Sequence, residues 1–393
     1  MNDHLTVVDA AVLLTPVEQF APARLVIRNG RIDQAGKAGD IAPPAGATRL
    51  DLSRRTVAPG FIDLHIHGAG GVDVMEGSYA ALNTVSRTIA AAGVTAFFPT
   101  TASSPAADLG AAVENLGSLI RGGGFEGATP LGIHLEGPFI NPLKRGAHPA
   151  ASLRSLDPEN IRLLGEWSQR SGRAIRRVTF APELPHAEDL IAMAKTEGFT
   201  LAMGHSDASA DEASRAAAAG VRYAVHTFNA MRPFSPRDPG ITGAVLTDDR
   251  IYAEIIADGI HVAPRGVRVF ARSKGRDRVV LVTDAVAASG MPDGRYRLGS
   301  ETIQLSGGVC RAADGHLAGS ALRLDTALRN YMNWTDATLQ DALFGVTVNP
   351  ARALGLDGHG VIAPGARADL VAIDSHGEVS LTMVGGRVVY ERA

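Results

Sequence analysis

Eight short runs of apolar residues, separated by alanine-rich segments of helical period, lie between about residues 60 and 345. A run that is mostly apolar, rather than apolar only at alternate positions, is typical of a parallel strand buried on both faces. Eight strand–helix units over this length predict an α/β fold of the (β/α)₈ TIM-like barrel type. The runs are Phe61–Ile66, Val94–Pro99, Leu131–Leu135, Ile175–Ala181, Thr200–Met203, Arg222–Val225, Ile251–Ala257 and Val279–Val282.

The segments before and after these runs have a different pattern. Short stretches with β-branched residues, interrupted by Gly and Pro, predict strands on either side of the barrel. We expect residues 1–58 and 346–393 to form one small β-sandwich domain beside a catalytic barrel of residues 59–345. The flanking strands are predicted at Leu5–Val8, Arg24–Ile27, Gly30–Gln34, Leu370–Ile373, Val379–Val384 and Arg387–Tyr390, and a hairpin inserted after the eighth barrel strand at Arg295–Leu298 and Glu301–Leu305.

Ionisable side chains stand at the carboxyl ends of the predicted barrel strands, where the active sites of barrel enzymes form. A single buried histidine is usually a core residue satisfied by a hydrogen bond. Burying six ionisable groups costs several kcal/mol for each one, so we expect the six to serve one common function. They are His65 and His67 at the end of the first strand, Glu136 at the end of the third, His205 of the fifth, His226 of the sixth and Asp284 of the eighth.

The residue types at these strand ends favour a metal site. In His65-Ile66-His67 the two-residue period of a strand turns both imidazoles to the same side. With two further histidines, and with Glu136 placed to bridge, the set offers ligands for one or two divalent ions per chain. Zinc fits this donor set best, and iron, manganese or cobalt also fit it. A water on such an ion has a pKa of about 7. Asp284 is then either the general acid–base or a carboxylate that orients a ligand histidine.

Composition excludes several other functions. A formal net charge of −3 gives no basic field for nucleic acid or an anionic membrane. Cys310 is the only cysteine, which excludes an intrachain disulfide and a cysteine-rich zinc site. The sequence lacks an apolar run of transmembrane length, and Met1-Asn2-Asp3-His4 does not resemble a secretory signal. We therefore expect a cytoplasmic enzyme.

Several motifs resemble those of a known family. The segment Pro59–Gly68 is similar to the strand-one signature of the amidohydrolase superfamily, and Asn349–Arg352 with Pro364–Val371 to its C-terminal segment. Four interior motifs narrow the resemblance to the N-acetylglucosamine-6-phosphate deacetylase family, and the likeness covers essentially the whole chain. These motifs are His134–Phe139, Gly204–Ser206, His226–Met231 and Val282–Ala285.

The resemblance implies roles for individual residues. It gives Glu136, His205 and His226 as ligands of the core metal, and His65 and His67 as ligands of a second metal. It implies that Asp284, also counted among the metal ligands, carries protons, and that His148 contacts the substrate near its amide. The other substrate-binding residues implied are Ala147, Asn229, Ala230, Arg237, Asp258 and His261, together with a loop over the sugar at Leu317, Ala318 and Gly319.

The activity implied by the resemblance is hydrolysis of N-acetyl-D-glucosamine 6-phosphate to glucosamine 6-phosphate and acetate, in amino-sugar catabolism or cell-wall recycling. The expected assembly is a homodimer or homotetramer, in which Arg237 or His261 acts in its own site or across a subunit interface. Alternatives are the same reaction on the galactosamine epimer, a dipeptidase or cyclic amidase, and a non-catalytic scaffold that has lost its metals. On residue type alone, Arg237 could be a solvated loop charge and His148 a surface histidine.

Overall fold

The barrel is present in the computed structural model, which describes residues 4–15, 17–374 and 376–392. Within this part of the chain, eight parallel strands follow one another in sequence order. Backbone hydrogen bonds from Asp284 N to His65 O and from His67 N to Ala285 O join the last strand to the first. The strands are β6 (Phe61–Ile66), β9 (Val94–Thr101), β11 (Ile133–Glu136), β12 (Ile175–Phe180), β13 (Thr200–Met203), β14 (Tyr223–Ala224), β15 (Tyr252–Ile256) and β16 (Val279–Val282).

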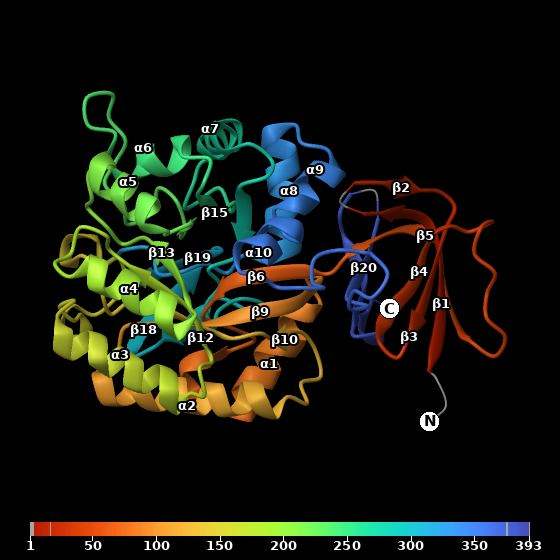
Figure 1. Cartoon of the computed structure of the whole chain (residues 1–393), viewed down its shortest axis with the longest axis horizontal. Coiled ribbons are helices and arrows are strands. Elements are labelled where there is room, and N and C mark those ends of the chain that lie inside the picture. Colours follow the sequence, from red (N-terminus) through yellow and green to blue (C-terminus); the bar gives the residue numbers. More distant parts are fainter. Residues whose placement is uncertain (1–3, 16, 375, 393) are drawn as a thin grey trace.

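Helices surround the barrel because their apolar faces pack on its strands (Figure 1). In α1, for example, Leu82, Val85 and Ile89 are buried, whereas the opposite face is polar. Side-chain caps begin several helices, among them Ser209, whose hydroxyl accepts a hydrogen bond from the backbone N–H of Glu212. The helices are α1 (Tyr79–Ala90), α2 (Ala106–Gly122), α3 (Pro158–Arg170), α4 (Ala187–Glu197), α5 (Ala210–Ala219), α6 (Gly240–Thr247), α7 (Pro264–Lys274), α8 (Leu324–Thr335), α9 (Leu339–Phe344) and α10 (Val348–Ala353), with short 3₁₀ turns η1 (Val74–Glu76), η2 (Pro142–Lys144) and η3 (Ala150–Ser152).

The two ends of the chain meet in a second, mostly antiparallel sheet beside the barrel (Figure 1). This confirms the expected small β domain. The strand at 48–59 was not predicted, because its charged and polar residues obscure the apolar alternation. Its pairing with β1 is long and contains a register shift. The sheet has the order β22 (Arg387–Glu391), β21 (Val379–Val384), β20 (Leu370–Ile373), β5 (Thr48–Pro59), β1 (Leu5–Leu14), β3 (Ala23–Arg28), β4 (Arg31–Lys37), with β2 (Gln19–Phe20) pairing with β1.

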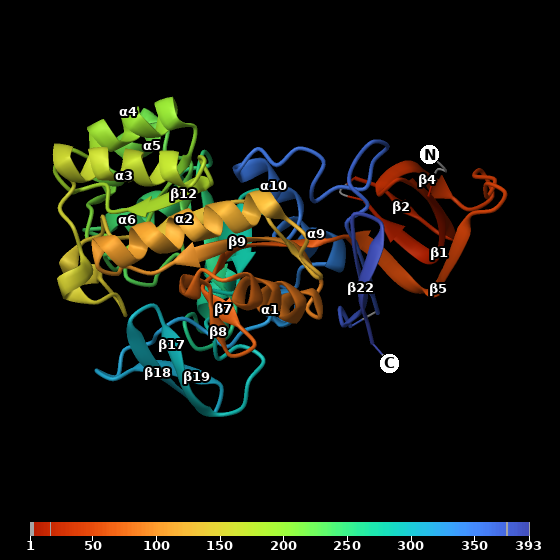
Figure 2. The same ribbon diagram turned by 90° about the horizontal axis from the view of Figure 1, so that it is seen from below.

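The insertion after β16 has one strand more than the predicted hairpin. Its strands β17 (Gly294–Leu298), β18 (Glu301–Ser306) and β19 (Val309–Ala312) form a sheet of their own beside the barrel (Figure 2). Apolar side chains of this insertion pack on Val286, Ala288 and Ala318, which follow the eighth barrel strand. This packing brings the insertion to the carboxyl end of the barrel. Short strands β7 (Gly68–Ala69), β8 (Val72–Asp73) and β10 (Thr129–Pro130) complete the fold.

Two of the expectations concern the location of the protein in the cell rather than its fold. Among the described residues, none of the helices is both long and apolar enough to pass through a bilayer. Met1, Asn2 and Asp3, on which the expectation about a secretory signal rests, lie outside the described residues. The cytoplasmic location stays a prediction.

Candidate active site

The strand-end residues leave their strands in an unusual backbone conformation. His205, His226 and Asp284 all have positive φ angles, of 47°, 27° and 50°. Residues other than glycine rarely adopt this conformation, and such strain is kept mainly where the surrounding structure requires it. At these three positions the turn places a polar side chain at the mouth of the barrel, just after a strand of buried apolar residues.

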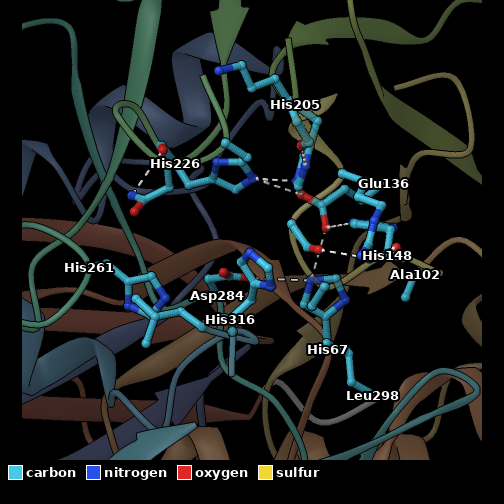
Figure 3. A pocket seen from close by; sticks show the side chains of 18 of the residues that line it. His67, Ala102, Glu136, His148, His205, His226, His261, Asp284, Leu298 and His316 are labelled. Atoms are coloured by element: carbon cyan, nitrogen blue, oxygen red, sulfur yellow. Dashed lines mark hydrogen bonds and ion pairs between the residues drawn. The ribbon is translucent and has the colours of Figure 1, made fainter. Parts of the chain in front are cut away.

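Glu136 lies at the centre of the predicted site, and its carboxylate is surrounded by imidazoles (Figure 3). It is only 3% exposed. Burial alone raises its pKa, but His65 and hydrogen bonds from the other histidines hold the pKa well below the usual value. Its Oε1 lies 3.0 Å from Nε2 of His226, 3.1 Å from Nε2 of His65 and 3.4 Å from Nε2 of His205, and its Oε2 lies 3.2 Å from Nε2 of His67 and 3.3 Å from Nε2 of His148.

The donor atoms have the arrangement of a metal site. The Nε2 atoms of His205 and His226 are 3.0 Å apart. Two donors bound to one tetrahedral zinc ion at 2.0–2.1 Å are separated by about 3.3 Å. His205 donates from Nδ1 to the carbonyl of Lys144, which leaves the Nε2 lone pair facing the site. The buried Nε2 of His65 has no hydrogen-bond partner among the described residues. The residues therefore fit divalent cations, which would satisfy these nitrogens.

Asp284 contributes the second carboxylate of the site. Its Oδ1 lies 3.2 Å from Nε2 of His67 and 3.5 Å from Nε2 of His65, and the residue is 9% exposed. Burial raises its pKa, but the two histidines outweigh that effect and lower the pKa to about 2. The side chain therefore reaches both the candidate ligands and the open pocket, which a proton carrier requires.

His148 is buried at the edge of the same cluster, where its ring has a defined tautomer. The backbone N–H of Ser103 donates to Nδ1 at 3.1 Å, so this nitrogen must be the acceptor. Burial and the neighbouring His205 lower the pKa of His148 to about 4, although Glu136 opposes the shift. A neutral imidazole with an accepting Nδ1 has its hydrogen on Nε2. His148 thus presents a donor at the pocket, and the surface-histidine interpretation is wrong.

A cavity of about 820 Å³ opens above these groups. His67, Glu136, His205, His226 and Asp284 form its floor, whereas His65 lies beneath and is fully buried. Most of the predicted substrate-binding residues line its walls, namely Ala147, His148, Asn229, Ala230, His261, Leu317 and Gly319. Figure 3 shows His261 and His316 on the opposite side of the cavity from His148.

Three predicted substrate-binding residues lie outside this lining. Ala318 is buried behind Leu317 and Gly319. Asp258 holds His261, whose Nδ1 lies 2.6 Å from Asp258 Oδ2. Although burial lowers the pKa of His261, Asp258 outweighs it and raises the pKa. Arg237 is exposed in the loop between β14 and α6.

The cavity also contains basic residues that the sequence analysis did not single out. Lys144 and Arg145 follow β11, and Arg311 and His316 come from the insertion. Arg145 reaches Asp314 of the insertion at 3.4 Å, which links the two sides of the mouth. The only sequence signal for Lys144 and Arg145 was their basic character a few residues before His148. Nothing in the hairpin pattern placed the far end of the insertion at the pocket.

The comparison with protein families agrees with this geometry. Residues 56–389 match the model described as "Amidohydrolase family". This range includes all eight barrel strands and most of the C-terminal part of the small sheet. The chain belongs to the amidohydrolase family.

Comparison with individual proteins shows a more specific similarity, to deacetylases of amino-sugar phosphates. The chain is 37% identical to an N-acetylglucosamine-6-phosphate deacetylase of Vibrio furnissii, over 88% of this chain and 86% of the other. It is 38% identical to an N-acetylgalactosamine-6-phosphate deacetylase of Escherichia coli O157:H7, over 88% and 90%. A solved structure of a mutant N-acetyl-D-glucosamine-6-phosphate deacetylase from Mycobacterium smegmatis, in complex with that sugar phosphate, superposes with a TM-score of 0.90 at 35% identity, covering 98% of this chain and 99% of the other.

Proposed function

We propose that this protein is a metal-dependent deacetylase that hydrolyses N-acetyl-D-glucosamine 6-phosphate to D-glucosamine 6-phosphate and acetate. The observation that carries the proposal is the Glu136 carboxylate within 3.4 Å of imidazole nitrogens from His65, His205 and His226, at the floor of a sugar-sized cavity. The high identity to deacetylases of amino-sugar phosphates supports the choice of substrate. Amino-sugar catabolism or cell-wall recycling is the corresponding setting.

The proposed metal set consists of one or two divalent ions, with zinc as the first candidate and iron, manganese or cobalt as alternatives. Glu136, His205 and His226 would hold the core ion, and His65 and His67 would hold the second, with Asp284 at its edge. A bound divalent ion of this kind supplies Lewis-acid polarisation and lowers the pKa of water. Every other part of the reaction falls to side chains of this chain.

His148 and Asp284 have separate roles in the remaining steps of the reaction. The Nε2–H of His148 donates to the carbonyl oxygen of the acetamide, and this bond strengthens as negative charge develops on that oxygen. Asp284 takes a proton from the attacking water and returns it to the nitrogen as the C–N bond breaks. In the metal-free protein the pKa of about 2 keeps Asp284 ionised at neutral pH. The His148 pKa of about 4 keeps that ring neutral and its Nε2 a donor.

The sugar and its phosphate occupy the rest of the cavity. Asn229, Ala230 and the loop at Leu317–Gly319 line the part next to the cluster. His261 gives a donor for the phosphate, and Asp258 raises the pKa of its ring and so favours the protonated form. Arg237 is exposed and outside the lining of its own cavity, so we assign it to the cavity of a neighbouring copy in a homodimer or homotetramer.

Steady-state kinetics test the substrate. The purified enzyme should hydrolyse the 6-phosphate far faster than unphosphorylated N-acetylglucosamine, and chelation should abolish both reactions. Arg237→Ala should raise KM for the 6-phosphate strongly, since losing one partner of a charge pair costs about 2–5 kcal/mol. It should hardly alter the unphosphorylated reaction, which never used that contact. Equal losses on both substrates would contradict the phosphate assignment and leave the metal-hydrolase proposal standing.

Mixing variants tests the assignment of Arg237 to a neighbouring copy. Arg237→Ala and Asp284→Asn should each be poorly active alone. A mixed dimer has one cavity with both residues intact, so random 1:1 mixing should restore about a quarter of wild-type activity. No recovery in a mixture that size exclusion shows to be exchanged would place Arg237 in its own cavity.

A second candidate substrate is N-acetylgalactosamine 6-phosphate. The 38% identity to a deacetylase of that sugar phosphate favours it. The two substrates differ in the orientation of one hydroxyl, and the cavity lining includes several groups that could contact either form. The ratio of kcat/KM for the two epimers decides between them.

A further inference from the structure

A buried ionic network lies directly beneath the candidate metal site. Glu254 on β15 and Arg177 on β12 are both fully buried, and Arg177 Nη1 donates to Glu254 Oε1 at 2.7 Å. Arg177 Nη2 donates to Nδ1 of His134 at 2.9 Å. The guanidinium also lies 4.7 Å from the ring centroid of Tyr223. Such a pair costs desolvation energy that apolar residues of the same volume would avoid, so its presence in a barrel core calls for a function.

The other oxygen of Glu254 makes contacts that point to such a function. Oε2 accepts a hydrogen bond from Nδ1 of His65 at 2.9 Å, because a carboxylate can only accept. The same oxygen accepts the backbone N–H of His226 at 3.2 Å. These two histidines belong to different halves of the candidate site. A single carboxylate therefore contacts one residue of each half from below.

The contact with His65 fixes how that ring can act. With its hydrogen on Nδ1, the neutral ring has its lone pair on Nε2, the atom that lies 3.1 Å from Glu136. The contact with His226 fixes the backbone at a residue whose φ of 27° is strained. Metal-binding histidines commonly donate their second nitrogen to a carboxylate, which orients the ring and raises its basicity.

We propose that Glu254 is a positioning residue for both halves of the metal site, and that Arg177 holds its carboxylate in place. Glu254 touches neither the cavity nor any substrate, so it acts through His65 and His226. Arg177 is held in turn by His134, whose Nε2 donates to the hydroxyl of Thr179 at 2.7 Å. This inference rests on the proposed metal site and adds the residues that align it.

The test is zinc affinity of Glu254→Gln, measured on the full-length, metal-stripped protein by competition with a chromophoric chelator. The amide keeps the size of the side chain but loses its charge and offers one oxygen in place of two. We expect the weaker of the two zinc affinities to fall about 10–100-fold, the usual effect of removing such a partner. The Michaelis constant should change little and kcat should fall, because the substrate does not meet Glu254.

Asp325→Asn is the matched control. Asp325 is 2% exposed and paired with Arg323 and Arg329 on α8, away from the candidate ligands. It therefore shares the burial and the arginine pairing of Glu254. Both variants should lower the unfolding temperature of the metal-free protein, but only Glu254→Gln should lower zinc affinity. Equal zinc affinities in Glu254→Gln and wild type, or equal losses in the two variants, would overturn the proposal.

A second variant keeps the proposal testable if Glu254→Gln folds poorly. Arg177→Lys keeps the positive charge but loses the two-pronged contact with Glu254 and His134. It should lower zinc affinity by a smaller factor than Glu254→Gln does. Unchanged affinity in a folded Arg177→Lys protein would also overturn the proposal. A wild type that binds neither zinc nor iron, manganese or cobalt would instead remove the metal site, and with it the proposed function.

Discussion

Replacing Glu136 with Gln is the sharpest single perturbation of the site. The carboxylate is 3% exposed and has imidazole nitrogens of five histidines within 3.4 Å of its two oxygens. Glutamine has the same shape but lacks the charge, and its amide nitrogen would face imidazole nitrogens in place of an oxygen. The substitution therefore removes the negative centre of the cluster with little change in packing.

The magnitude follows from the burial of that charge. Breaking a buried ion pair by removing one partner costs about 3–5 kcal/mol. Since a factor of ten corresponds to about 1.36 kcal/mol, the core metal should bind about 10²–10⁴-fold more weakly. Both sites should weaken, because Oε1 faces His205 and His226 whereas Oε2 faces His67. Activity at limiting metal should fall in proportion.

The assay is metal content after dialysis against a graded series of chelator concentrations, with Glu183→Gln as the control. Glu183 accepts hydrogen bonds from Asn141, Ser206 and the backbone of Asp207, next to the site but without contact to a candidate ligand ring. It should retain metal like the wild type. A Glu136→Gln protein that also retains wild-type metal through the same series would refute the ligand assignment.

Two further predictions concern protons. Asp284→Asn should keep fold and metal but lose on the order of 10²–10⁴ in turnover, and a loss under tenfold by steady-state assay would leave Asp284 only an orienting role. In the metal-free protein, burial lowers the pKa of His67 but Asp284 and Glu136 outweigh it and raise the pKa to about 9, so the ring is protonated at neutral pH. Metal ligands must be neutral, so zinc binding at pH 7.5 should release on the order of one proton or more, and zinc affinity should rise with pH up to about 9. Weakly buffered titration with a pH indicator measures this, and no release would mean that His67 is not a ligand.

The barrel and its site could be predicted because their signals are local. Phe61–Ile66, Thr200–Met203 and Val279–Val282 have the predicted bounds, since each is a short apolar run ended by a polar or glycine residue. Parallel strands put their carboxyl ends at one edge, so ligands far apart in sequence were expected together. The structure brings the six strand-end groups into overlapping clusters, in which His65 lies with Glu136 and His226 and also with His67 and Asp284, and Glu136 lies with His205.

The features that escaped prediction depend on non-local packing. Arg311 and His316 reach the cavity only because the insertion packs on Val286 and Ala318. Glu254 lies in the middle of an apolar strand, at Tyr252–Ile256, where a lone carboxylate gives no hint of its partner. Arg177 is 77 positions away on another strand, and only barrel closure places the two side chains 2.7 Å apart.

Together with the strained strand ends, the buried pair of Glu254 and Arg177 explains how the barrel can hold so many ionisable side chains in one place. Glu254 and Arg177 balance each other's charge below the site. Above them, Glu136 and Asp284 carry two negative charges among histidines, and in the metal-free protein protons on His65 and His67 offset them. Divalent ions replace those protons with a larger positive charge at the same position. Protons on His65 and His67, or divalent ions in their place, would thus offset the two carboxylates of the site.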